Sequence, residues 1–155
     1  MDWGGVIMNR YLSRDNKSRH TRKTTDVFEM ASGIIMQTSI QCVAMQPNNI
    51  NELPEVEIDF LKELPSTWDE TIFIDGYPGK YVVLARKHES KWYVAGLNAE
   101  KEVKELLLEL PMFEGETNIN YYTDKEDGYA ILTNLKVDKG KVKVTMQPNG
   151  GFILK

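Results

Sequence analysis

The spacing of apolar residues changes within the segment Leu64–Thr71. Before this segment apolar side chains recur every three or four residues, as in helices, and after it they alternate, as in strands. Pro65 predicts the end of the preceding helix, because proline lacks an N–H and restricts the residue before it. We therefore expect a helical segment over residues 1–70 and a β domain over residues 71–155. Trp68 is interpreted as filling the seam between them, with ligand stacking as the alternative.

The first predicted helix begins at Asp26 and runs to about residue 46. Asp26 suits the N-cap position, and Glu29 follows at the spacing of a capping box. Apolar residues cover more than one face, which predicts a buried helix. Polar residues interrupt the run well short of the roughly 20 residues that a membrane span needs, so no span is expected. Because so apolar a helix must be covered, we expect it, in this chain alone, either to pack onto the β domain in a new way or to mediate self-association.

A second helix is expected to begin at Pro54, because proline suits the first turn of a helix. Glu55, Glu57 and Asp59 follow it. These acids are interpreted as the solvated N-terminus of the helix, where negative charge favours the dipole. A calcium-binding or catalytic cluster is the alternative interpretation.

The alternation after residue 71 predicts about eight short strands in an antiparallel sandwich. Tyr77–Lys80 contains Pro-Gly and predicts a type II turn, since glycine readily adopts the positive φ that this turn requires. Two hairpins are expected, one between residues 80–87 and 91–98 and one across Asp138–Gly140. The fold class is therefore α+β, with one or two N-terminal helices followed by an all-β sandwich. The expected strands are 71–74, 80–87, 91–98, 104–110, 117–123, 130–137, 141–146 and 152–154.

Charge is unevenly distributed along the 155 residues, whose formal net charge is −4. Residues 1–23 contain six Lys or Arg against two Asp, a net charge of +4, so the remainder carries −8. A basic segment of this kind raises nucleic-acid binding through residues 10–23 as one hypothesis, for which steep salt dependence would be diagnostic. No aromatic platform is interleaved with these charges, so we expect no nucleic-acid partner.

Catalytic and metal motifs are lacking in the sequence. The single cysteine, Cys42, lies among apolar residues and is interpreted as a buried, inert thiol, and a Cys/His zinc site cannot form. Asp69 and Glu70 are adjacent acids. Because neighbours in a strand point to opposite faces, this pair cannot act together as general acid and base on one bond. Five aromatics of the β half favour core packing, with a sugar-stacking platform as the alternative: Trp92, Tyr93, Tyr121, Tyr122 and Tyr129.

Several stretches together suggest a known family: residues 26–35, 39–44, 65–71, 75–87, 91–101 and 144–152. They resemble the C-terminal portion of glycoside hydrolase family 97, and residues 65–98 are the most specific part. The resemblance implies a parent with an N-terminal β-sandwich, a central (β/α)8 barrel and a small C-terminal β domain associated with oligomerisation. Such parents are α-glucosidases or α-galactosidases, either inverting or retaining, and the residues that decide between these lie outside this chain.

The resemblance also assigns parts of the chain. Residues 1–5 would end the eighth barrel strand, and the helix from Asp26 would be the last barrel helix. The catalytic carboxylates and calcium-binding glutamates of the family lie upstream, so we expect no catalytic residue, cofactor or metal site in this chain, with calcium implied for the parent alone. Asp2 and Trp3 are candidates for contact with substrate, because loops after barrel strands face the active site. A periplasmic or secreted location is implied as well.

Two functions compete on these grounds. The first is a structural and oligomerisation region of a family 97-like glycosidase, inactive alone, whose partners are the rest of the barrel or a second copy that associates through the 26–46 helix. The parent would act on an oligosaccharide. The alternative is a non-catalytic carbohydrate-binding β-sandwich module that uses the aromatics of the β half, for which sugar binding without salt dependence would be diagnostic.

Overall fold

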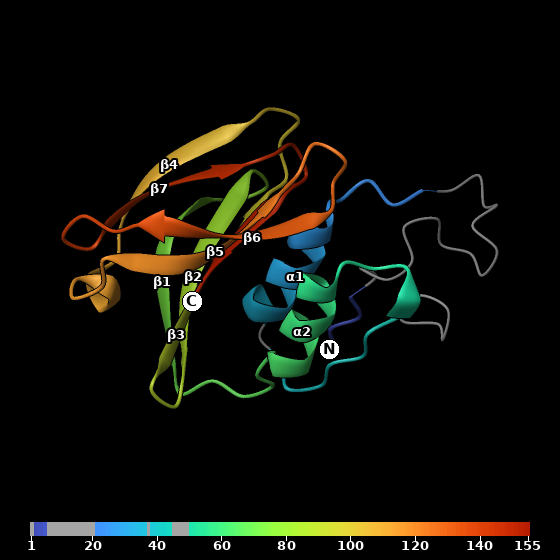
Figure 1. Cartoon of the computed structure of the whole chain (residues 1–155), viewed down its shortest axis with the longest axis horizontal. Helices are drawn as coiled ribbons and strands as arrows, with labels where there is room; N and C mark the ends of the chain where they lie inside the picture. Colours follow the sequence, from blue (N-terminus) through green and yellow to red (C-terminus); the bar gives the residue numbers. More distant parts are fainter. Residues whose placement is uncertain (1, 6–20, 37, 45–49) are drawn as a thin grey trace.

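The computed structural model describes residues 2–5, 21–36, 38–44 and 50–155. It has three layers (Figure 1). Two helices, α1 (Asp26–Ile35) and α2 (Glu55–Glu63), lie on one face of a six-stranded sheet, and a two-stranded sheet covers the other face. The expected α+β arrangement with an antiparallel sandwich is confirmed.

The described residues contain eight strands in two sheets. The larger sheet has the order β1-β2-β3-β8-β5-β6, the smaller one consists of β4 and β7, and every pair of these strands is antiparallel. The turn Tyr77–Lys80 is confirmed, since Gly79 has a φ of +79° and the Lys80 N–H donates to the Tyr77 carbonyl at 2.9 Å. The strands are β1 Glu70–Tyr77, β2 Tyr81–His88, β3 Lys91–Asn98, β4 Lys104–Glu109, β5 Asn118–Asp124, β6 Ala130–Lys136, β7 Lys141–Met146 and β8 Gly151–Leu154.

The prediction of a hairpin across Asp138–Gly140 is wrong. β6 pairs with β5 in the larger sheet, whereas β7 pairs with β4 in the smaller one. Lys139 and Gly140 both have positive φ, and the Gly140 carbonyl accepts the Leu110 N–H at 2.7 Å. This tight turn therefore carries the chain from one sheet to the other. The alternation of apolar residues does not distinguish such a turn from a hairpin.

Two hydrophobic cores share the large sheet. One lies between the sheets and contains Val83, Phe152 and Leu154, and the other lies under the helices and contains Met30 and Ile153. Successive residues of β8 thus enter opposite cores, as the pleat of a strand requires. All four residues of β8 are buried, so this short strand is the centre of the fold.

The first helix is shorter than the sequence predicted. Thr25 rather than Asp26 is its N-cap, since its side chain accepts the Phe28 N–H at 3.2 Å, and the helix ends at Ile35. Gln41 instead forms a parallel bridge with Trp3, so this part of the chain is extended. Pairing with the N-terminal segment overrides the helical spacing of the apolar residues. Cys42 is exposed, so its expected burial is wrong. Residues 37, 45 and 46 of the predicted helix lie outside the described ranges.

Side chains of the sheet hold both ends of α1. At the N-terminus Asp124 accepts the N–H of Val27 at 3.3 Å and that of Gly151 at 3.1 Å. At the C-terminus the buried Arg86 guanidinium donates to the carbonyls of Ile34 at 2.8 Å and Met36 at 3.1 Å. An acid at the positive end and a cation at the negative end both favour the helix dipole and satisfy terminal backbone groups. Both ends of α1 are therefore held by side chains of the β-sheet.

The carboxyl group of Asp124 gives a prediction on pH. Burial raises its pKa to about 6, against the hydrogen bonds from Thr25 and the two backbone N–H groups. The folded protein therefore binds this proton more tightly than the unfolded chain does. The resulting contribution to the free energy of unfolding is complete below about pH 4 and is lost as the pH rises through about 6. The variant Asp124→Asn carries an amide at this position, which does not titrate. We expect the unfolding free energy of the native chain to fall relative to the variant by about 2 kcal/mol between pH 4 and pH 7.

Denaturant titrations of both proteins across this pH range test the prediction. Taking the difference between the two proteins cancels the titration of all other groups. A difference that stays constant with pH, or that rises toward neutrality, would contradict it.

The second helix ends before Pro65, as predicted, with Leu64 at its C-cap. The prediction that its N-terminal acids are all solvated is wrong for Glu57, which is fully buried. Its carboxylate accepts the Ala130 N–H at 2.8 Å and so ties α2 to β6. Glu57 lies three residues before the buried Phe60 and therefore on the same helix face.

Trp68 fills the seam between the helices and the sheet, which confirms its structural interpretation. Its ring meets that of Tyr93 edge-on at 5.4 Å, and the Arg86 guanidinium lies 4.7 Å from the ring centre. Trp68 thus supports the same arginine that holds the C-terminus of α1.

Candidate functional site: the groove beside α2

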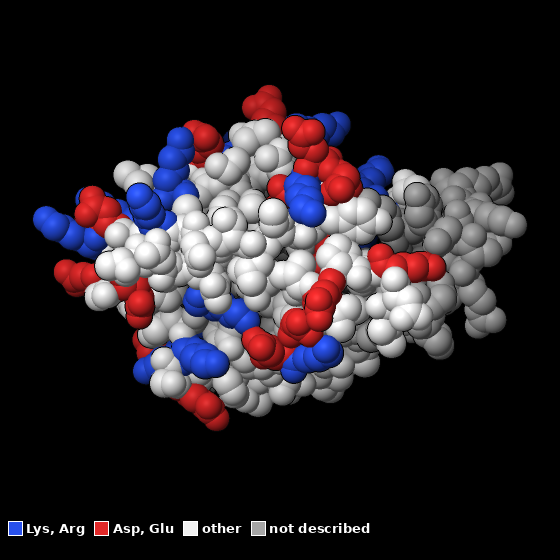
Figure 2. Space-filling model, in the orientation of Figure 1, with Lys and Arg blue, Asp and Glu red and all other residues white. Residues whose placement is uncertain are grey.

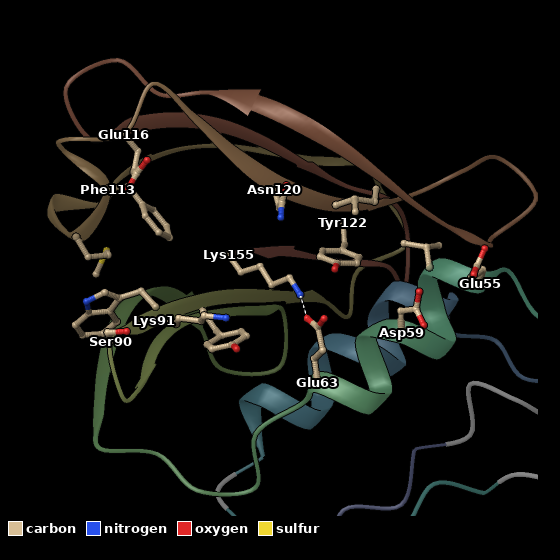
Figure 3. Close-up of a pocket in the computed structure, with 15 residues that line it drawn as sticks. Glu55, Asp59, Glu63, Ser90, Lys91, Phe113, Glu116, Asn120, Tyr122 and Lys155 are labelled. Carbon is tan, nitrogen blue, oxygen red and sulfur yellow. Dashed lines mark hydrogen bonds and ion pairs between the residues drawn. The ribbon is translucent and has the colours of Figure 1, made fainter.

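A groove of about 790 Å³ lies between α2 and the large sheet (Figure 3). We call it the α2 groove. Its walls come from distant parts of the chain: α2, the start of β3, the segment after β4, β5 and the C-terminus. The lining includes Glu55, Asp59, Glu63, Trp92, Tyr122 and Lys155.

Three acids of α2 line one wall of the groove. Glu55, Asp59 and Glu63 are spaced by four residues, which places them on one face of the helix. Glu63 forms an ion pair of 2.6 Å with Lys155, whose ammonium lies 5.5 Å from the centre of the Tyr122 ring (Figure 3). The C-terminal residue of the chain is therefore held across the groove.

The electrostatics of the groove do not suit acid catalysis by Glu63. Its hydrogen bond to Lys155 and the charge of that lysine lower the pKa of Glu63 below its ordinary value. A glycosidase needs a carboxyl that is protonated near neutral pH together with a second, ionised one. Asp124 has a raised pKa, but it lies outside the lining of the α2 groove and its oxygens accept backbone N–H groups. The groove is instead a recess of mixed character, in which the ion pair between Glu63 and Lys155 lies beside aromatic side chains.

Neither Asp2 nor Trp3, the predicted substrate contacts, lines the α2 groove. The Trp3 indole is buried, donates to the Ser32 hydroxyl at 2.7 Å and packs on Gly33. Asp2 is exposed. Contact of either residue with substrate stays a prediction.

Three of the five aromatics singled out in the β half are core residues. Tyr93, Tyr121 and Tyr122 are buried, and the Tyr121 hydroxyl donates to the Thr145 carbonyl at 3.0 Å. Trp92 and Tyr129 are half-buried. The packing interpretation is therefore confirmed for the three tyrosines, and a broad stacking surface for sugar rings is not formed by this set.

No local pattern in the sequence indicates the α2 groove, because Lys155 and Glu63 are 92 residues apart. The spacing of four between the acids of α2 does indicate a shared face, but that pattern is common on solvated helices. Asp69 and Glu70, the adjacent acids, are both exposed, and Asp69 accepts the N–H of Glu89 in the turn between β2 and β3 at 2.6 Å.

Figure 2 shows acidic and basic side chains interspersed on the face that carries β6 and α2. Most of the basic segment 10–23 lies outside the described residues, so binding of nucleic acid through it is not tested. Within the described ranges, no three His, Cys, Asp or Glu side chains are grouped to hold a metal ion, and no helix has the length and apolar character of a membrane span.

Solved structures share this fold. A crystal structure of a beta-arabinopyranosidase is 46% identical and superposes with a TM-score of 0.93 over 99% of this chain and 24% of that one. The packing of α1 on the sheet is therefore an arrangement that this relative shares, and not a new one. A glycoside hydrolase family 97 enzyme from Pseudoalteromonas sp. strain K8 has the same fold at 18% identity. It superposes with a TM-score of 0.79 over 99% of this chain and 26% of the enzyme's chain.

Sequence comparison agrees. A retaining alpha-galactosidase of Bacteroides thetaiotaomicron is 27% identical over 135 residues, which are 82% of this chain and 20% of that protein. The chain thus spans about a fifth to a quarter of these relatives. The family model described as "Glycosyl-hydrolase 97 C-terminal, oligomerisation" matches residues 67–155. Since that match covers more than half of the sequence, the chain belongs to the C-terminal family of glycosyl-hydrolase 97.

Proposed function

We propose that this chain is the non-catalytic C-terminal part of a family 97 glycoside hydrolase and that it associates with further copies of itself. The match of residues 67–155 to an oligomerisation family carries the proposal. The rest of the glycosidase is the second partner, because relatives are about four to five times longer than the region they share with this chain. The division of the chain at residue 70 stays a prediction, and the family match begins close to it.

The parent is proposed to act on galactosides or arabinopyranosides rather than glucosides. The relatives that support this are the beta-arabinopyranosidase at 46% identity and the retaining alpha-galactosidase at 27%. Both are enzymes that hydrolyse a glycosidic bond, and the second retains configuration, as its name states. Calcium in the parent, an oligosaccharide substrate and a periplasmic or secreted location stay predictions.

The proposed lack of turnover is supported by the groove. Glu63 is ionised and paired with Lys155, and Asp59, which also lines the groove, pairs with Lys62 at 2.8 Å. Neither carboxylate is placed to protonate a leaving group. We therefore assign the chemistry to residues outside this chain.

An activity assay tests this part of the proposal. The purified chain, with calcium present, is incubated with aryl α-galactoside, aryl β-arabinopyranoside and aryl α-glucoside. We expect no turnover of any of the three. Turnover that survives repurification, and that disappears in the variant Glu63→Gln, would contradict the proposal and place a catalytic centre in the α2 groove.

A further inference from the structure

A second hollow, of about 410 Å³, lies at the turn between β1 and β2. Its walls are mostly apolar and come from α1 and three adjacent strands. We call it the β1 patch and define it by Phe28, Phe73, Tyr77, Val82 and Leu97. It shares no residue with the α2 groove.

The β1 patch exposes large aromatic side chains. Phe73 is 64% exposed and Tyr77 is 60% exposed, although both belong to a strand of the main sheet. α1 lies against β3 and β8, and its residue Phe28 marks the border of the uncovered corner. Contiguous exposed apolar surface of this kind is typical of a contact face.

The arrangement around the β1 patch fits an interface. The Phe73 ring lies close over Gly76, since a Cβ added at Gly76 would stand 3.2 Å from a ring carbon. Lys80 provides a polar margin, since it lines the hollow, lies 5.2 Å from the centre of the Tyr77 ring and pairs with Glu100 at 4.0 Å. An aromatic centre with a polar rim is the usual composition of a protein–protein contact.

Another exposed apolar residue lacks these features. Leu107 on β4 is 70% exposed, but its neighbours on the strand, Glu105 and Glu109, form ion pairs with Lys143 and Lys141. Leu107 is therefore a single apolar side chain on a charged, solvated strand face. Among the described strands β1 pairs with β2 alone, so its outer edge is available to a partner as well.

We propose that the β1 patch is the contact face between two copies of this chain. The inference rests on the proposed self-association, and the family match to an oligomerisation domain identifies the occupant as a second copy. In a two-fold contact the same patch serves both copies, and Phe73 of each copy enters the apolar hollow of the other. Tyr77 and Phe73 are then the anchors, as aromatics commonly are.

Sedimentation analysis of matched variants tests the proposal. Phe73→Gln removes an anchor, and Leu107→Gln makes the same kind of change at a comparably exposed residue. We expect the native chain and Leu107→Gln to share one oligomeric mass, and Phe73→Gln to dissociate with a Kd that is higher by about tenfold or more. Tyr77→Gln is expected to weaken association in the same direction, and equal thermal unfolding midpoints show that the variants are folded.

The two proposals fail in different ways. A native chain that is monomeric at all concentrations would overturn self-association itself, and the β1 patch with it. A native oligomer that Phe73→Gln and Tyr77→Gln leave intact would overturn the β1 patch alone and leave the family function standing.

Discussion

Phe152→Ala is expected to lower the free energy of unfolding by about 4 kcal/mol, the largest loss that we predict for a single substitution. Phe152 is fully buried on the central strand β8, between the two sheets. Its removal leaves a cavity where β3, β8 and the small sheet meet, and that core cannot collapse without moving strands. Denaturant titration followed by circular dichroism measures the loss.

Gly96 provides the matched control for Phe152. A Cβ added at Gly96 would lie 2.2 Å from a carbon of the Phe152 ring, so Gly96→Ala alone is expected to lower the unfolding free energy by about 1–3 kcal/mol through overpacking. In the background of Phe152→Ala the added methyl group meets no ring. The double variant is therefore expected to be clearly more stable than the sum of the single losses predicts. Strict additivity, or a Phe152→Ala loss below about 1 kcal/mol, would contradict the packing described here.

Arg86→Met is expected to lower the free energy of unfolding by about 3 kcal/mol. The guanidinium donates to the carbonyls of Ile34 and Met36 at the end of α1, and hydrogen bonds from charged groups contribute about 1.5–3 kcal/mol each. Methionine keeps much of the apolar volume but leaves these buried carbonyls without their donor. Thermal and denaturant unfolding of the variant measure the loss.

Two further variants separate the role of the guanidinium from that of its charge. Arg86→Lys keeps the charge but loses the planar fork that reaches two carbonyls, so we expect an intermediate loss. Lys136→Ala changes an exposed cation on β6 and is expected to stay within about 0.5 kcal/mol of the native chain. Equal stability of Arg86→Met and Lys136→Ala would mean that the sheet does not hold the end of α1.

The strands were the most predictable part of the fold, because local chemistry fixes them. Alternation in residues 91–98 and 141–146 predicted β3 and β7 with the bounds observed. The partner of each strand is not local information. The turn Asp138–Gly140 has the residues of a hairpin, yet it joins two sheets, because the apolar side chains of β7 belong to the core that faces β4.

The end of one helix was predictable and the end of the other was not. Pro65 stopped α2 as expected, whereas the run after Ile35 continued the apolar spacing and still left the helix. The extended conformation at Gln41 depends on pairing with Trp3, 38 residues earlier. The burial of Arg86 could be inferred from the sequence, since it shares a strand face with the apolar Val82 and Leu84. Its acceptor, the Met36 carbonyl at the end of α1, could not, because it is 50 residues away.

The candidate sites depended on tertiary structure. The α2 groove is completed by Lys155 at the end of the chain, and the β1 patch is completed by Phe28 of α1. Neither residue stands out in the sequence, because each acquires its surroundings through packing. The family resemblance, by contrast, rested on contiguous stretches such as residues 75–87 and needed no tertiary information.

The mass of the native chain in solution tests the proposed function most directly. Sedimentation equilibrium over a wide range of concentrations gives this mass without reference to any substrate. We predict that it rises to an integral multiple of 17.8 kDa and then remains constant. A mass that stays at 17.8 kDa at every concentration would contradict a self-associating C-terminal domain.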